Sequence, residues 1–277
     1  PIDSETTGGE PAISYAGSEY FLALYNLRRG PLMDPDVRQA LSLALDRESI
    51  ARQVSPAGAT LLAANLLPQH WALKDADLSP PAYDPVQAGE LLSQAGWTDD
   101  DGDGFRSPWG QALSLHVLTN GENRLRVATA SLVAQSYRLA GVESELRVVE
   151  WGIFLDLLFR HDYDVAVLSW PFPLDPDQRL FWTSEEMEAG RGFNFPQWES
   201  ESADDLLARA AALPGCDAGA RASLYGQFAR LLAEERPADF LFAPHHPMWV
   251  RAGVSGPDPS PFAGPLWNVH RWRAGAP

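Results

Sequence analysis

The sequence predicts an α/β fold in which a parallel or mixed sheet is flanked by helices. Residues 112–170 alternate between strand-like and helix-like patterns, and parallel strands need helical crossovers of this kind between them. Residues 165–168 are entirely apolar, which is typical of a short strand buried on both faces. Aspartate-proline pairs at 34–35 and 84–85 are typical helix starts, so helices are expected outside the alternating region as well.

Three helices are predicted before residue 100. Asp34 is expected to cap the first, Asp46 the second and Asp84 the third. Gly96 should end the third helix, because glycine readily adopts the left-handed backbone that stops a helix. The apolar positions at helical spacing are Val37, Leu41, Ala44 and Leu45, then Ile50 and Val54, then Ala88, Leu91, Leu92 and Ala95.

Residues 112–170 should build the parallel part of the sheet. Alternating apolar residues predict strands, and a helix between the first two should end at Gly141. The predicted order is a strand at 113–118, a helix with an apolar face of Leu125, Ala128, Leu132, Val133 and Leu139, a strand at 142–148, a short helix at 154–158 and a strand at 165–168.

The chain after Trp170 is less regular. Residues 171–198 are rich in proline and aromatic residues and form a longer connection than a compact domain needs, which favours a functional loop. Helices are predicted through 203–213 and 224–232, and strand-like segments at 240–242 and 249–250. The last segment, rich in proline and glycine, should leave the α/β unit.

Composition excludes several classes of protein. The chain has 277 residues and a net charge of -16, which repels phosphate backbones and argues against nucleic acid as a partner. Its single cysteine, Cys216, excludes an internal disulfide and lies in a loop without a neighbouring histidine to activate it. No apolar run approaches the roughly 20 residues that cross a bilayer. Residues 1–4 do not resemble a signal peptide, and residues 1–19 are expected to be a linker and an incoming strand.

Several segments, in order, resemble bacterial extracellular solute-binding proteins of family 5, the receptors for oligopeptides, dipeptides and nickel that serve ABC importers. The resemblance runs from about residue 11 to the C-terminus and is most specific in its first segments. The segments are 20–26 with 36–50, 67–71, 83–97 with 101–104, 163–170, 175–177 and 193–194.

The resemblance implies a type II periplasmic-binding-protein fold, the Venus flytrap, of which this chain would be the second lobe. Family members are about twice as long and close two hinged lobes on a ligand. Residues 20–238 would form the ligand-binding lobe, and residues 239–277 would return towards the first lobe with strands that could lack partners.

The implied function is capture of a peptide, oligosaccharide or other small solute and its delivery to ABC permease subunits. The protein would not be an enzyme and would use no cofactor or metal. It would lie outside the cytoplasm, either in the periplasm or on the cell surface as a lipoprotein whose tether lies outside this segment. Two alternatives remain: a glycan hydrolase that uses carboxylates beside tryptophans, and a structural or sensory binding module.

The candidate ligand site follows the strand at 165–168, where open α/β sheets bind ligands. Trp170 and Phe172 would offer flat apolar surfaces, and Asp175 and Asp177 would accept hydrogen bonds from amines or hydroxyls. The alternative for the aspartates is a turn and a helix cap. Two further candidates in the same loop, Phe193 and Asn194, have packing as their alternative role.

One position departs from the family pattern. Peptide receptors of the family commonly carry an aspartate a few residues after the tryptophan, where it pairs with the α-ammonium group of the peptide. Pro173 stands near that position here. Either Asp175 takes the role after a shift, or the ligand has no free amine.

Three other features are expected to be structural. Asp99, Asp101 and Asp103 with Gly104 spell the first half of a calcium loop, but Gly110 replaces the glutamate at its twelfth position, which favours a turn. The adjacent pair His245-His246 should diverge and lie on the surface rather than bind a metal. Tryptophans that could stack on sugars, though most should pack internally, include Trp97, Trp109, Trp151, Trp182, Trp198, Trp249 and Trp267.

Overall fold

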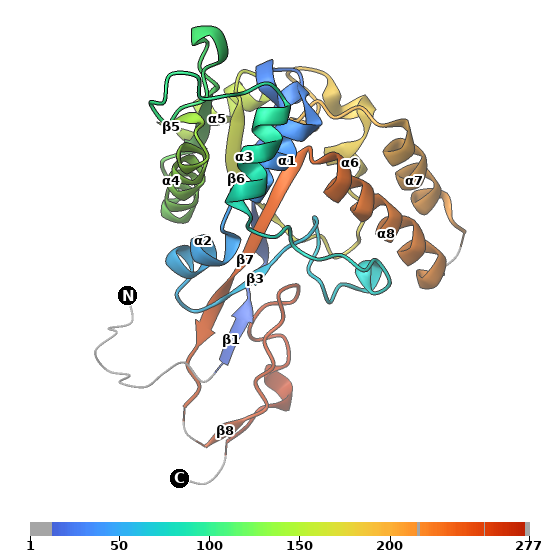
Figure 1. Ribbon diagram of the computed structural model, residues 1–277. Helices are drawn as coiled ribbons and strands as arrows, with labels where there is room; N and C mark the ends of the chain where they lie inside the picture. The colour runs from blue at the N-terminus through green and yellow to red at the C-terminus, as the bar shows by residue number, and fades with distance from the viewer. Residues whose placement is uncertain (1–12, 215–216, 252, 275–277) are drawn as a thin grey trace.

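The computed structural model describes residues 13–214, 217–251 and 253–274. Within these ranges one mixed sheet has the strand order β1-β7-β2-β6-β4-β5, and β3 also pairs with β7 (Figure 1). The strands are β1 Ile13–Ala16, β2 Glu19–Tyr25, β3 Ala59–Leu61, β4 Ser114–Asn120, β5 Glu143–Val149, β6 Val165–Pro171 and β7 Ala238–Met248. The small hairpin β8 Val254–Ser255 with β9 Arg273–Ala274 is separate.

Strand directions confirm the predicted parallel region. Strand β4 pairs in parallel with β5 and β6, so the carboxyl ends of all three lie at one edge of the sheet. Strand β2 runs antiparallel to β6, with Glu19 opposite Pro171. The start of β2 therefore reaches the same edge, called here the carboxyl edge.

The predicted helix starts and stops are confirmed. The side chains of Asp34, Asp46 and Asp84 accept backbone N–H groups from Asp36, Ser49 and Gln87 respectively. Gly96 and Gly141 have φ of +88° and +83°, as left-handed helix stops require. The helices are α1 Pro35–Leu43, α2 Arg47–Val54, α3 Pro85–Gln94, α4 Arg124–Leu139, α5 Trp151–Phe159, α6 Arg179–Trp182, α7 Glu201–Ala212 and α8 Ala218–Glu235.

The sheet divides the core into two layers. Alternate residues of β2 serve each layer: Tyr20 and Leu22 pack with residues of α5, α7 and α8, and Phe21 and Ala23 pack with residues of α1 to α4. Figure 1 shows α7 and α8 on one side of the sheet, and α3 and α4 on the other. Among the described residues, no helix has the length and apolar character needed to cross a membrane.

Two predictions about helical faces and loops are corrected. Leu125 and Leu139, expected on the apolar face of α4, are 38% and 78% exposed. The buried stripe runs through Thr129, Ala130, Val133, Ala134 and Tyr137, of which only Val133 was expected. Residues 171–198 are not a continuous loop: they contain α6 and a 3-10 helix at Ser184–Met187. The sequence signal for α6 is weak because the helix is only four residues long.

Strand β7 departs most from expectation. It begins at Ala238 and pairs with β1, β2 and β3, so residues 239–248 are partnered in the sheet. The boundary expected at 238/239 falls inside this strand, which changes partners along its length. Residues 249–250 lie outside any strand.

Candidate functional site

The carboxyl edge gathers polar side chains from three strands and one helix. Strand β4 ends at Asn120, β6 brings Ser169 near its end, and β2 starts with Glu19. Helix α4 begins after a short turn in which Asn123 Oδ1 accepts the N–H groups of Leu125 and Arg126. This turn places Arg126 in the first helical turn, beside the strand ends. Ligands of open α/β sheets bind at such edges.

Arg126 is the centre of a polar network at this edge. Its Nε and Nη2 donate to Ser169 Oγ at 3.0 and 2.9 Å, and its Nη1 donates to Asn120 Oδ1 at 2.9 Å. Ser169 Oγ in turn donates to Glu19 Oε2 at 2.6 Å. Burial lowers the pKa of Arg126, and the charge of Glu19 opposes that effect. The network therefore holds a partly buried guanidinium in one orientation at the edge.

Trp151 and Glu122 extend this network along the edge. The Arg126 guanidinium lies 5.4 Å from the centre of the Trp151 ring, which is 42% exposed. Glu122 accepts hydrogen bonds from Asn120 Nδ2 and from the Trp151 backbone N–H, both at 3.0 Å, and these bonds lower the pKa of its carboxyl. An exposed indole beside an oriented guanidinium can contact both apolar and polar parts of a ligand.

The predicted aromatic residues of the next loop mostly face inward. Trp170 and Phe172 are each 8% exposed. The Trp170 ring centre lies 4.7 Å from that of Phe181, and the Phe172 ring centre lies 4.9 Å from that of Tyr20. The alternation of β6 sends Trp170 to the layer of α7 and α8, opposite to Ser169. A ligand at this edge would reach only the margins of these two rings.

Asp175 and Asp177 both shape the turn and form ion pairs. Asp175 Oδ1 accepts the Asp177 N–H at 3.0 Å, and Asp177 Oδ1 accepts the Arg179 N–H at 3.1 Å, as the turn alternative predicts. Asp175 also pairs with both terminal nitrogens of Arg221, at 3.0 and 2.8 Å. This pairing holds the pKa of the Asp175 carboxyl below its ordinary value. Asp177 pairs with the Arg179 side chain at 2.8 Å.

Phe193 and Asn194 hold the irregular segment together. Asn194 is fully buried, and its amide donates to the carbonyls of Thr183 and Trp198 while its Oδ1 accepts the Trp198 N–H. The Phe193 ring centre lies 5.5 Å from that of Phe159. Both residues thus have the packing role that was the alternative to ligand binding.

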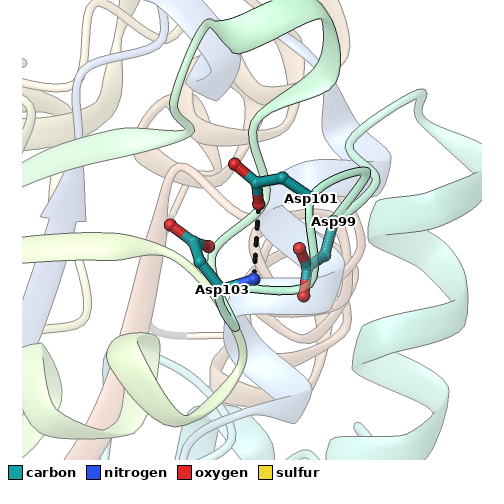
Figure 2. A group of neighbouring side chains, drawn as sticks. All are labelled: Asp99, Asp101 and Asp103. Atoms are coloured by element: carbon teal, nitrogen blue, oxygen red, sulfur yellow. Dashed lines mark hydrogen bonds between the residues drawn. The ribbon is translucent and has the colours of Figure 1, made fainter.

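The aspartate turn at 99–104 is explained by backbone hydrogen bonds. Figure 2 shows Asp99, Asp101 and Asp103 around this turn, and one ligand oxygen from each lies within 4.8 Å of the others. Asp99 accepts the N–H groups of Gly102 and Gly104, and Asp103 accepts that of Phe105. The following residue, Arg106, bonds to Gly141 beside the start of β5, so the turn lies at the opposite end of the parallel strands.

The remaining predicted residues are distributed as follows. His245 is partly buried rather than on the surface, with Nδ1 3.2 Å from Ser14 Oγ and Nε2 2.9 Å from Thr60 Oγ1, and burial lowers its pKa. His246 is exposed, so the two rings diverge as predicted. Cys216 and the Trp109 side chain lie outside the described residues. Trp182 and Trp198 are buried, Trp97 is partly buried, and Trp249 and Trp267 are exposed.

A surface hollow of about 360 Å³ lies at the amino ends of β4 and β6 and is lined in part by Arg29, His116 and Asp164. Its polar groups contact one another: Arg29 Nε lies 3.0 Å and His116 Nδ1 3.1 Å from the two oxygens of Asp164. Because these groups satisfy each other and lie away from the carboxyl edge, the candidate site remains at that edge.

The mixed sheet with helices on both sides has the fold of one lobe of a type II periplasmic binding protein, as two solved structures show. The structure of AppA, the oligopeptide-binding protein from Bacillus subtilis in complex with a nonapeptide, matches with a TM-score of 0.78 at 27% identity, over 95% of this chain and 52% of AppA. NikZ from Campylobacter jejuni, in complex with Ni(L-His), matches with a TM-score of 0.76 at 26% identity, over 94% of this chain and 52% of NikZ.

The chain belongs to the bacterial extracellular solute-binding proteins, family 5, whose middle-region model matches residues 2–188. In sequence it is 29% identical to AppA of Bacillus subtilis over 90% of this chain, and 27% identical to the dipeptide-binding protein of Escherichia coli over 84%. It spans 45% and 42% of those two relatives. The resemblance to family 5, which was predicted from segments that match in the same order along the chain, is confirmed.

Proposed function

We propose that this chain is the second lobe of a two-lobed receptor that captures a peptide or other small solute for an ABC importer. The observation that carries the proposal is the Arg126 network at the carboxyl edge, which joins the ends of β4 and β6 to the start of β2. Family membership and the nonapeptide bound by AppA support a solute of this class.

The network suits reversible capture. Arg126 is oriented by Ser169 and Asn120 before any ligand arrives, so little ordering is needed on binding. A guanidinium has more N–H donors than these bonds use, so one can be directed at a ligand oxygen. Contacts made by both lobes would favour the closed state, which the permease subunits then recognise.

The carboxylates at and near the carboxyl edge give no support to glycan hydrolysis. A glycosidase needs a carboxylic acid whose pKa is raised so that it can donate a proton. The pKa of Asp175 is lowered by Arg221, and that of Glu122 by hydrogen bonds from Asn120 and Trp151. The family to which the chain belongs is one of solute-binding proteins.

A location outside the cytoplasm is part of the same proposal, because the family's members are described as extracellular. Attachment to a membrane through a lipid stays a prediction.

The experiment is mass spectrometry of solute retained by the complete two-lobed protein, followed by calorimetry with the identified compound. We expect one molecule of a small solute per protein. Arg126→Ala should weaken binding by about tenfold or more, as expected for loss of a hydrogen bond to a charged group. Arg209→Ala is the matched control, because Arg209 makes an exposed pair with Asp205 on α7. Absence of any bound solute, or its conversion to products, contradicts the proposal.

A further inference from the structure

The loop after β6, residues 172–178, has no unpaired carboxylate. Its two acidic residues, Asp175 and Asp177, each pair with an arginine. Arg221 contacts both oxygens of Asp175, with Nη1–Oδ2 at 3.0 Å and Nη2–Oδ1 at 2.8 Å. A two-point pair of this kind is stronger and more directional than a single contact. The loop and its two arginine partners, Arg179 and Arg221, therefore have no net charge together.

Arg221 is held in place by its own neighbours. It comes from the first turn of α8, and its Nη2 also lies 3.1 Å from the Tyr225 hydroxyl. Its guanidinium lies 5.7 Å from the centre of the Trp71 ring and 5.4 Å from that of Tyr225. The side chain is only 23% exposed, compared with 58% for that of Asp175. The arginine is thus fixed by packing, and the aspartate lies on the outside of the pair.

Little accepting capacity remains on the two carboxylates. Besides the bonds from Arg221, Asp175 Oδ1 accepts the Asp177 N–H. Both oxygens of Asp177 accept from the Arg179 side chain, and Oδ1 also accepts the Arg179 N–H. An incoming ammonium group would have to displace a fixed guanidinium or remain close to its positive charge.

Besides Asp175, the exposed rim of the loop carries apolar side chains. Leu174 is 78% exposed, and Pro171 is also exposed. On the other side of the edge, Glu19 is hydrogen-bonded to the Ser169 hydroxyl, which also accepts from Arg126. The part of a ligand that contacts this loop therefore meets apolar side chains and neutralised carboxylates.

On this basis we infer that Arg221 determines specificity by occupying Asp175, so that the receptor selects solutes with no free ammonium group at this loop. The inference rests on the proposed receptor function and defines its ligand class: N-blocked peptides or neutral oligosaccharides. Arg221 acts through Asp175 and is a positioning residue, so its replacement should change selectivity rather than abolish capture.

The test compares a tripeptide, its N-acetylated form and a neutral oligosaccharide by calorimetry on the complete two-lobed protein. The wild type should bind the acetylated peptide or the oligosaccharide at least about tenfold more tightly than the free peptide. Comparison of the acetylated peptide with the oligosaccharide shows which of the two ligand classes the receptor binds. Arg221→Met keeps an apolar stem and frees Asp175, so it should shift the affinity ratio towards the free peptide by about tenfold.

Two further variants complete the test. Asp175→Asn added to Arg221→Met should abolish the gain for the free peptide, whereas Arg209→Met should leave the ratio unchanged. A wild type that prefers the free peptide, or a ratio unaltered by Arg221→Met, overturns the inference and leaves the receptor proposal standing. If the wild type binds none of the three compounds and retains no solute on purification, the receptor proposal falls, and this inference falls with it.

Discussion

Arg47 on α2 and Asp239 on β7 form a buried ion pair, with Nη2 2.8 Å from Oδ1 and both side chains 2% exposed. Asp239 also accepts hydrogen bonds from the hydroxyls of Tyr25 and Ser42. The pair therefore joins the first helices to the strand that returns at the end of the chain. Residues 47 and 239 have no relation that the sequence alone could reveal.

Removal of one partner of this pair should destabilise the lobe strongly. Arg47→Met should lower the free energy of unfolding by about 3–5 kcal/mol, because Asp239 would remain buried without its ion-pair partner. Urea denaturation followed by circular dichroism measures the effect. Arg52→Met on the same helix is the control, since Arg52 makes only an exposed contact of 3.6 Å with Glu48. Equal effects of the two substitutions would contradict the structural role of the buried pair.

Trp170 should contribute mainly to stability. Trp170→Ala removes a large side chain that packs against Tyr20, Phe181 and Trp182, and should cost about 3–5 kcal/mol. Asp175→Ala should cost less than about 1 kcal/mol, because the Asp175 side chain is 58% exposed and water can replace part of its contact with Arg221. Thermal denaturation compares the two variants, with exposed Trp151→Ala as the aromatic control. A melting temperature unchanged by Trp170→Ala would contradict this packing.

His70 should make the lobe less stable in mild acid. Burial lowers the pKa of His70, although nearby Asp175 and the Leu174 backbone oppose the effect, and Nδ1 accepts the Ala72 N–H. The unfolded chain then binds more protons than the folded one below the ordinary histidine pKa of about 6.5. Stability contributed by the neutral ring is present above that pH and is lost as the pH falls through the lower folded pKa.

The measurement is urea denaturation at pH 7 and pH 5. His70→Asn keeps an acceptor for the Ala72 N–H but does not titrate, so the loss of stability in acid should be smaller than in the wild type. His270→Asn, at an exposed position, should leave the loss unchanged. A wild-type difference that His70→Asn does not reduce would show that other groups cause the acid sensitivity.

The aspartate turn should not depend on calcium. Both oxygens of Asp99 accept backbone N–H groups, and Asp101 and Asp103 each accept another within the same turn. Addition of 1 mM calcium or of EDTA should shift the melting temperature by less than about 1 °C, because only a ligand that binds the folded state raises it. A concentration-dependent rise with calcium alone would contradict the interpretation as a turn.

Much of the fold was predictable because its signals are local. Helix caps at Asp34, Asp46 and Asp84, and the stops at Gly96 and Gly141, depend on hydrogen bonds and backbone angles within a few residues. The parallel region followed from the order of elements and the period of apolar residues. The resemblance to family 5 was also predictable from the sequence, since it depends on segments that occur in the same order along the chain.

The candidate site was predictable only in its place. The carboxyl edge follows from strand order, but in the sequence Ser169 and Trp170 look equally suitable as ligand contacts. The alternation of β6 decides which of them joins the polar network of Arg126 and which enters the core. Polar residues at the ends of successive strands, such as Asn120, were the available signal for this network.

The sequence by itself thus determined the class of fold, the main helices and strands and the edge proposed here as the ligand site, because each depends on neighbours along the chain. Only the tertiary structure decided which charged side chains form ion pairs and which remain available to a ligand. Asp175 meets Arg221 across 46 positions, and Asp239 meets Arg47 across 192. Pairing at such distances depends on how packed helices and strands bring side chains together, and no local pattern encodes it.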